Sequence, residues 1–133
     1  MCTEVVAAVI CREERYLLCR RPLDKQHGGL WEFPGGKVQP GEGLQAALKR
    51  ELTEELAVES APADTVAARI RVESPAPLLI VFIDTVITGN PEALEHEEIG
   101  WFEPAEVLAL SLAPADAAFA RQRFAQGTSR RTP

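Results

Sequence analysis

Residues 36–58 constrain this chain more than any other stretch, because a turn rich in glycine and proline leads directly into a charged segment with evenly spaced leucines. If residues 43–56 form a helix, each residue turns the side-chain direction by about 100°. Glu51, Glu54 and Glu55 then share one narrow arc beside the leucines, which form a stripe suited to a hydrophobic core. The stripe consists of Leu44, Leu48, Leu52 and Leu56. The sequence therefore predicts an amphipathic helix whose carboxylates border its buried face.

Carboxylates crowded beside an apolar face repel one another and lose hydration, which is costly unless something compensates. Oxygen ligands at helical i, i+3 and i+4 spacing suit a hard divalent ion such as Mg²⁺ or Mn²⁺. We therefore expect Glu51, Glu54 and Glu55 to bind such an ion. The alternative is a solvated acidic helix face that Lys49 and Arg50 neutralise.

The segment before this helix is also unusual. In residues 33–37, Phe-Pro-Gly-Gly-Lys, two adjacent glycines stand where the backbone must turn sharply or approach a ligand closely. Unpaired N–H groups at the helix start near Gly43 would favour an anion.

The spacing of these residues resembles the Nudix box, which is a Gly, an early Glu, Arg-Glu-apolar-any-Glu-Glu, then a Gly and an apolar residue. Gly36, Glu42 and residues 50–56 match it, and the one mismatch is Ala57, where the family usually has Gly. The run Trp-Glu-Phe-Pro-Gly-Gly-Lys at 31–37 is similar to MutT-type nucleotide pyrophosphohydrolases. The run Leu-Ala-Pro-Ala-Asp at 112–116 resembles a branch that acts on CTP-type and oxidised nucleotides.

The alternation of apolar runs and turns predicts strands interleaved with helices, and so a mixed sheet between helices. The resemblance implies a Nudix-type α/β/α sandwich. The length predicts a single domain at 1–126, and the basic residues at 127–133 predict a flexible tail. The expected strands are 5–11, 16–20, 30–33, 66–72, 78–88 and 99–102. The expected helices after the box are 104–110 and 114–124, and residues 60–64 are expected to break the chain.

Cleavage of a phosphoanhydride needs charge neutralisation, an aligned water and a proton acceptor. The resemblance implies that water attacks a phosphorus of the triphosphate, which yields a nucleoside monophosphate and pyrophosphate, and that the Gly36 carbonyl joins the metal ligands. We expect Arg50 to orient the carboxylates, and Glu42 either to support them or to face the helix dipole.

A Glu in the loop before a Trp joins the metal site in MutT-like enzymes, and Glu95 matches that position. It is a candidate ligand or general base, with Glu98 as its competitor and a solvated acidic loop as the alternative. His96 is a candidate proton acceptor or a bystander. The catalytic candidates are Arg50, Glu51, Glu54 and Glu95. The metal candidates are Gly36, Glu51, Glu54, Glu55 and Glu95.

Phosphate and base contacts are expected elsewhere. Arg21 matches a phosphate-contacting arginine of the family, and Lys37 could also reach phosphate, although either could be an ordinary solvated charge. Asp116 stands where MutT enzymes acting on 8-oxo-dGTP typically carry Asn. An ionised Asp only accepts hydrogen bonds, which suits the cytosine amino group or the N–H edge of guanine. Phe33 and Leu78 could line the base pocket or belong to the core.

The composition limits the partners. A net charge of −6 over 133 residues argues against nucleic acid and membrane surfaces. Cys2, Cys11 and Cys19 show no paired spacing, which predicts reduced thiols in a cytoplasmic protein, and no signal peptide is expected. We expect a monomer or weak homodimer that binds a small nucleoside triphosphate.

Three functions remain open at this point. The default is hydrolysis of an oxidised nucleoside triphosphate, 8-oxo-dGTP in particular. The second is a pyrophosphohydrolase of the same chemistry directed at CTP or dCTP. The third is a Nudix-fold nucleotide-binding module without catalysis, although such modules usually lack the box glutamates that are present here.

Overall fold

The computed structural model describes residues 2–73 and 75–125. The predicted flexible tail at 127–133 lies outside these residues. The strands are β1 (Thr3–Val9), β2 (Cys11–Arg12), β3 (Arg15–Arg20), β4 (Trp31–Glu32), β5 (Gly35–Lys37), β6 (Glu59–Pro62), β7 (Ala68–Val72), β8 (Leu78–Thr88) and β9 (Glu98–Phe102). The helices are α1 (Leu44–Leu56), α2 (Pro104–Ala109) and α3 (Pro114–Ala120), and a π-helical turn, Arg121–Ala125, continues α3.

The described strands form a mixed sheet and a smaller antiparallel sheet. The mixed sheet has the order β5-β1-β8-β6, and β7 also pairs with β8. Strands β1 and β8 are parallel, whereas the other pairs of this sheet are antiparallel. Strand β8 is long enough to pair with β7 along its first half and with β6 along its second half. The second sheet has the order β2-β3-β4, with β9 also paired to β3.

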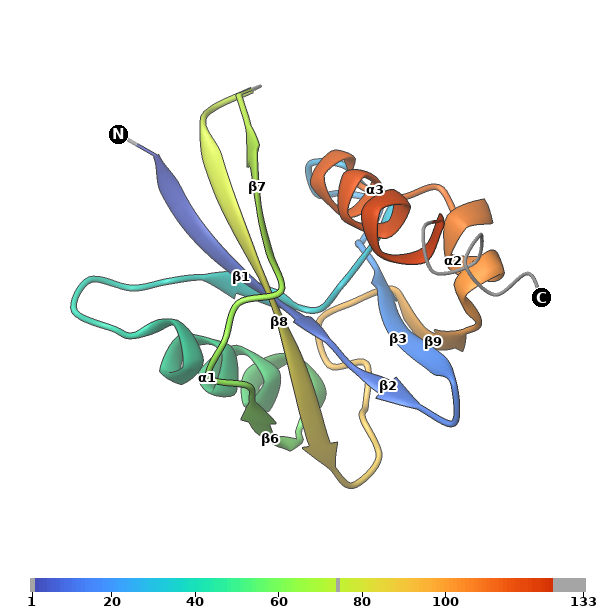
Figure 1. Ribbon diagram of the computed structural model, residues 1–133, viewed down its shortest axis with the longest axis horizontal. Helices are drawn as coiled ribbons and strands as arrows, with labels where there is room; N and C mark the ends of the chain where they lie inside the picture. Colours follow the sequence, from blue (N-terminus) through green and yellow to red (C-terminus); the bar gives the residue numbers. More distant parts are fainter. Residues whose placement is uncertain (1, 74, 126–133) are drawn as a thin grey trace.

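Helices cover both faces of this sheet system, with α1 on one side of β1 and α3 on the other (Figure 1). Val6 and Ala8 are buried in the cluster that contains the leucines of α1. Ala7 and Val9 are buried in a second cluster that contains Phe119 of α3. Because successive side chains of a strand point to opposite faces, the two clusters lie on opposite sides of β1. The predicted α/β/α sandwich is confirmed.

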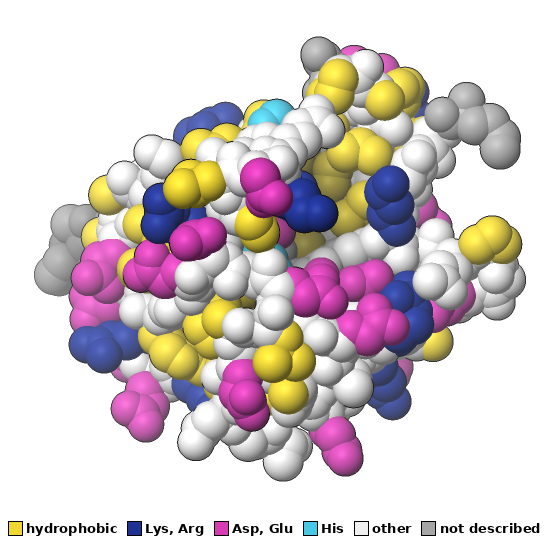
Figure 2. All heavy atoms as spheres, turned by 180° about the vertical axis from the view of Figure 1, so that it is seen from behind, with side chains coloured by type: hydrophobic (Ala, Val, Ile, Leu, Met, Phe, Trp, Pro, Cys, Tyr) yellow, Lys and Arg dark blue, Asp and Glu magenta, His cyan; other side chains and the backbone are white. Residues whose placement is uncertain are grey.

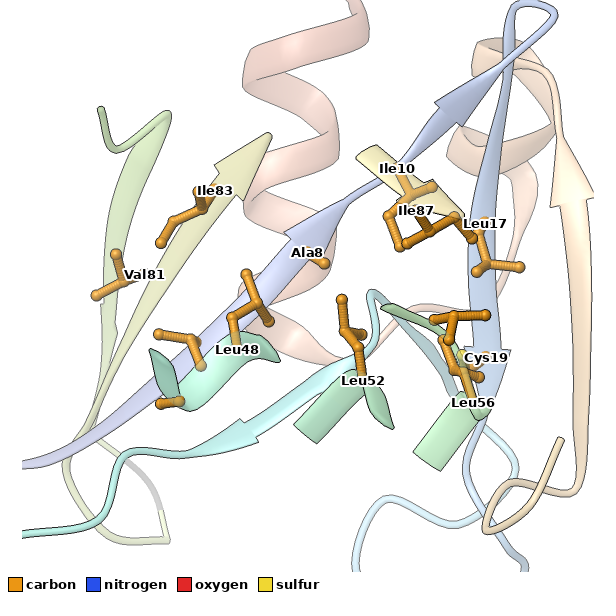
Figure 3. Close-up of a cluster of buried hydrophobic side chains, with 13 residues drawn as sticks. Ala8, Ile10, Leu17, Cys19, Leu48, Leu52, Leu56, Val81, Ile83 and Ile87 are labelled. Carbon is orange, nitrogen blue, oxygen red and sulfur yellow. The ribbon is translucent and has the colours of Figure 1, made fainter. Parts of the chain in front are cut away.

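The predicted leucine stripe of α1 forms the centre of the first cluster. Leu48, Leu52 and Leu56 are fully buried. They lie together with apolar side chains of β1, β3 and β8 (Figure 3). Burying a leucine side chain stabilises a fold by about 1.5–3 kcal/mol. This packing fixes the rotation of α1, and with it the direction of the neighbouring glutamates.

Several boundaries differ from the expectations. Residues 60–64 were expected to break the chain, but Glu59–Pro62 forms β6, because β8 offers it an edge to pair with. At Gly35 and Gly36 a sharp turn or a close approach to a ligand was expected, and residues Gly35–Lys37 form β5 against β1. The predicted strand at 5–11 divides at Ile10 into β1 and β2, which belong to different sheets. No helix in the described part of the chain is long and apolar enough to cross a membrane.

Helix α1 ends at the residue that departs from the box pattern. Ala57 has φ 59° and ψ 39°, a left-handed conformation, and its N–H donates to the Thr53 carbonyl at 3.1 Å. A Cβ atom makes this conformation unfavourable, by about 1–2 kcal/mol, whereas Gly adopts it freely. The structure thus places Ala where the backbone geometry favours Gly.

Replacing Ala57 with Gly should therefore stabilise the fold. We expect the free energy of unfolding in urea to rise by about 1 kcal/mol, since the relief of strain exceeds the added flexibility of the unfolded chain. Ala46→Gly, at an exposed right-handed position of the same helix, is the matched control and should cost about 1 kcal/mol. Equal destabilisation by both changes would contradict the strain at Ala57.

Candidate active site

Arg50, in the middle of α1, joins this helix to the segment before it. Its Nε donates to Glu42 Oε2 at 2.8 Å and its Nη2 donates to Glu42 Oε1 at 2.9 Å, so the two side chains form a two-point ion pair. Nη2 also donates to the Lys37 carbonyl at 3.0 Å. Hydrogen bonds from Arg50, and one from the Gln39 N–H, lower the pKa of Glu42 to about 2. Of the two roles expected for Glu42, the geometry favours support of Arg50.

The third nitrogen of Arg50 faces the carboxylates of α1. Nη1 donates to Glu51 Oε2 at 2.9 Å and to Glu54 Oε1 at 3.4 Å. One guanidinium therefore holds three carboxylates and a backbone carbonyl at once. Its five donors are used within the protein, so this arrangement suits orientation of the carboxylates and not a direct contact with substrate.

The surroundings of Glu55 disfavour a negative charge on its carboxyl group. Its Oε1 is buried and has no hydrogen-bond partner among the described residues. Burial raises the pKa of Glu55 to about 9, and the charge of Glu51 and a hydrogen bond with it add to this, as do Glu32 and Glu95. A buried oxygen without a partner, surrounded by negative charges, is a position where a cation would be strongly favoured.

Gly36 lies directly against this cluster. A Cβ atom at position 36 would overlap the Glu51 carboxyl group. The absence of a side chain is thus what lets the β5 backbone approach α1 here. The predicted metal residues Gly36, Glu51 and Glu55 are therefore adjacent, and all of them offer oxygen atoms.

Adding a methyl group at this point should disable the site. We expect Gly36→Ala to lower turnover at least tenfold, because the Glu51 carboxylate must leave its position. The measurement is the steady-state rate under saturating Mg²⁺. Gly43→Ala is the matched control, since a Cβ there meets no atom within 4 Å. Full activity of Gly36→Ala would show that the contact between β5 and Glu51 is not required.

The carboxylates are not gathered into a preformed ion cage. No three Asp, Glu, His or Cys side chains within residues 2–73 and 75–125 converge closely enough for that. Arg50 pairs with Glu51 and Glu54 through the hydrogen bonds described above, and it makes no such bond to Glu55 among the described residues. The donor set nonetheless fits a hard divalent cation, because it consists of oxygens and includes the unpartnered Oε1 of Glu55.

Glu95 lies in the loop between β8 and β9, exposed to solvent. Its charge contributes to the raised pKa of Glu55, so the loop brings it towards the α1 carboxylates. The competing candidate, Glu98, forms an ion pair with Arg20 at 3.5 Å instead. The structure therefore favours Glu95 over Glu98 as the loop residue of the metal site.

A cavity of about 470 Å³ lies next to the acidic cluster. The surface in Figure 2 is hollowed, with hydrophobic side chains in the hollow and acidic side chains gathered beside it. All the predicted phosphate- and base-contacting residues line this cavity. They are Arg21, Lys37, Phe33, Leu78 and Asp116, and Gly36 lines it as well. The structure thus brings together residues that the sequence separates widely.

Two of these residues, Phe33 and Asp116, are buried and hydrogen-bonded to each other. Phe33 is 3% exposed and belongs to the second core cluster, so its ring packs in the core as well as bordering the cavity. Its backbone N–H donates to Asp116 Oδ2 at 3.0 Å. This bond spans 83 residues of sequence and fixes the start of α3 against the segment before β5.

Asp116 differs from the expectation in its protonation. The side chain is buried, and burial is the main cause that raises its pKa to about 8, with Glu32 adding to the rise. At neutral pH the side chain is therefore mostly the neutral acid, which has one O–H donor beside its acceptor oxygen. Burial thus favours the neutral acid over the ionised, acceptor-only Asp116 expected from the sequence.

Sequence reasoning assigned no role to Glu32, although it lines the cavity. It accepts hydrogen bonds from Arg21 Nη1 at 3.1 Å and is joined to His96 Nε2 at 3.1 Å. Glu32 lies in the run 31–37 that resembles MutT enzymes, which was the available signal. The pairing with His96, 64 residues away, required the fold.

The comparisons with known proteins agree with this geometry. A family model described as NUDIX domain matches residues 2–123. The CTP pyrophosphohydrolase of Escherichia coli (strain K12) is 43% identical over 114 residues, which cover 85% of this chain and 84% of that protein. The putative 8-oxo-dGTP diphosphatase 2 of Mycobacterium tuberculosis (strain ATCC 25618 / H37Rv) is 36% identical over 115 residues, which cover 84% and 81%.

Solved structures show the same architecture. The solution structure of the E. coli ORF135 protein has a TM-score of 0.84 and 37% identity, and the match covers 98% of this chain and 94% of that chain. The MutT protein from Methanosarcina mazei Go1 has a TM-score of 0.81 and 27% identity, with 95% and 94% covered. The acidic helix, the glycine that contacts it and these matches lead to one conclusion: the chain belongs to the NUDIX domain family.

Proposed function

We propose that this protein is a divalent-metal-dependent nucleoside triphosphate pyrophosphohydrolase that prefers cytosine nucleotides. The observation that carries the proposal is a cavity of about 470 Å³ that is lined by Gly36, the residue in contact with Glu51 of α1, in a chain that is 43% identical to a CTP pyrophosphohydrolase. The products are a nucleoside monophosphate and pyrophosphate.

The metal end of the site consists of Glu51, Glu54 and Glu55, with the Gly36 carbonyl and Glu95 as further oxygen donors. A bound Mg²⁺ or Mn²⁺ supplies charge neutralisation for the phosphate chain and makes an attacking water more acidic. Arg50 holds Glu51 and Glu54 through its ion pairs with them. Glu54 and Glu95 are the exposed carboxylates available to accept the proton of the water.

The cavity end holds the rest of the substrate. Arg21 and Lys37 are the positive side chains on its wall, and they suit the phosphate chain. Asp116, Phe33 and Leu78 form the part suited to a base. The neutral acid of Asp116 presents a donor and an acceptor side by side, which complements the N3 acceptor and the amino donor of cytosine.

A second candidate substrate is 8-oxo-dGTP, the default expectation from sequence. Asp116 in its neutral form also complements the O6 acceptor and the N7–H donor of 8-oxoguanine. The similarity to the putative 8-oxo-dGTP diphosphatase extends over most of the chain but at lower identity, 36%. The comparisons therefore support the cytosine alternative better than this default.

A nucleotide panel tests the proposal. Purified protein with Mg²⁺ is incubated with CTP, dCTP, dGTP, 8-oxo-dGTP and dATP, and monophosphate and pyrophosphate are quantified. We expect kcat/KM for dCTP or CTP to exceed that for the other nucleotides at least tenfold. A higher value for 8-oxo-dGTP would overturn the cytosine preference. Nucleotide binding without hydrolysis would instead identify a binding module.

A further inference from the structure

A buried histidine stands in the exposed acidic loop that carries Glu95. The flanking residues Glu95 and Glu97 are exposed, whereas the His96 side chain is only 6% exposed. Burying one polar ring within a loop of solvated carboxylates costs free energy unless it makes a specific contact. The proposed function assigns no part to this side chain.

The contact that His96 makes is with Glu32. Its Nε2 lies 3.1 Å from Glu32 Oε2. Arg21 is ion-paired with the same carboxylate at 3.1 Å, and an ionised carboxylate only accepts hydrogen bonds. The Nε2 atom must therefore carry the hydrogen. Nδ1 is buried and has no hydrogen-bond partner among the described residues, so the ring depends on the Glu32 contact alone.

Backbone hydrogen bonds hold the loop on either side of this ring. The Leu94 N–H donates to the Glu55 carbonyl at 3.1 Å, and the Glu97 N–H donates to the Arg20 carbonyl at 2.9 Å. Glu95 and His96 lie between these two points. His96 supplies the side-chain anchor of this short span, and it ties the span to β4, in which Glu32 lies.

We propose that His96 is a positioning residue, which through its hydrogen bond to Glu32 holds the loop so that the Glu95 carboxylate faces Glu55. Because Glu32 also pairs with Arg21 on the cavity wall, the same bond sets Glu95 and Arg21 in fixed relation. This inference rests on the proposed role of Glu95 as a metal ligand. It adds a residue that acts through Glu95 without contacting metal or substrate.

Removal of a group that orients a metal ligand typically lowers metal affinity 10–100-fold. We expect a loss in this range for His96→Ala. His96→Gln should recover most of the affinity, because its amide N–H can donate to Glu32. Glu97→Ala is the matched control, since this neighbouring side chain is exposed and has no assigned role.

The test measures Mn²⁺ binding by electron paramagnetic resonance without nucleotide, so it does not depend on which substrate is hydrolysed. Thermal unfolding is followed in parallel, and a reduced affinity at unchanged Tm separates positioning from loss of fold. Wild-type affinity in His96→Ala, an equal loss in His96→Gln, or an equal loss in Glu97→Ala would each overturn the proposal.

A double-mutant cycle keeps the proposal testable if His96→Ala is less stable. In a Glu95→Gln background, the same change at His96 should lower Mn²⁺ affinity by less than twofold, because the ligand that it positions is already lost. An unchanged 10–100-fold effect in that background would show that His96 does not act through Glu95. If Mn²⁺ binds as expected but no nucleotide is hydrolysed, the proposed function fails and this inference stands.

Discussion

Replacing Glu55 with Gln should lower kcat by about three orders of magnitude and leave the metal-free fold at least as stable as wild type. A metal ion supplies several kcal/mol of charge stabilisation in the transition state, and about 1.4 kcal/mol corresponds to a tenfold change in rate. Gln is similar in shape to Glu but is a much weaker ligand for a hard cation. The loss should therefore appear in turnover and in metal affinity together.

The effect on stability has the opposite sign because of where Glu55 lies. Burial and the neighbouring carboxylates raise its pKa to about 9, so the metal-free fold must hold a proton that the unfolded chain gives up near its ordinary pKa of 4.5. Holding that proton at neutral pH reduces stability. Gln has no such proton, and its amide keeps the volume of the side chain.

Urea unfolding in EDTA at pH 7.5 and kcat under saturating Mg²⁺ measure the two effects. Glu59→Gln is the matched control, because Glu59 is an exposed residue of β6 away from the site, and it should change neither quantity. Activity of Glu55→Gln within tenfold of wild type would exclude Glu55 from the metal site. A large loss of stability in EDTA would show that its carboxyl group is a structural element.

Substitution of Asp116 is expected to have the second large effect on catalysis. Asp116→Ala should lower kcat/KM for the preferred nucleotide by about 10–100-fold, because it leaves polar groups of the base without partners at a cost of about 1–3 kcal/mol. Asp116→Asn keeps a donor and an acceptor, and should stay within threefold of wild type at pH 7. The Phe33 N–H keeps its acceptor in Asn but not in Ala.

The pH dependence of kcat/KM distinguishes the wild-type carboxyl group from the amide of Asp116→Asn. Burial raises the pKa of Asp116 to about 8, so the O–H donor is present below that value and lost above it. We expect kcat/KM of wild type relative to Asp116→Asn to fall as pH rises from 7 to 9. Identical pH profiles of the two proteins would contradict a donor role for Asp116.

The raised pKa of Asp116 also makes the stability of the fold decrease as pH rises. The folded protein keeps the Asp116 proton while the unfolded chain loses it near 3.8, so wild type loses stability as pH rises between about 4 and 8. Relative to Asp116→Asn, the difference in unfolding free energy should change by up to about 1.4 kcal/mol per pH unit in this window. Urea titrations of both proteins at several pH values measure it.

The local part of this structure could be predicted from sequence. The spacing of Leu48, Leu52 and Leu56 sets both the helix and its buried face, because periodicity acts within one element. The position of Glu55 next to that face followed from the same geometry. Strand β8 was expected at its observed bounds, since a long apolar run suits a strand covered on both faces.

The nonlocal part could not be predicted in this way. Strand β6 depends on a free edge of β8, and β5 depends on β1, so neither is encoded in its own few residues. The Glu32–His96 bond joins residues that are 64 positions apart in sequence, so it depends on the tertiary fold and not on local pattern. The neutral Asp116 is likewise a result of burial, which sequence position alone does not reveal.

The parallel pairing of β1 with β8 has a consequence for how the chain is made. Thr3 is in register with Leu78 and Val9 with Asp84, so the central ladder joins the first strand to one that is synthesised much later. Such distant pairing slows folding and delays it until the second strand has left the ribosome. Nascent chains ending before Thr88 should therefore remain protease-sensitive, and the newly made β1 is a natural client for chaperones during that interval.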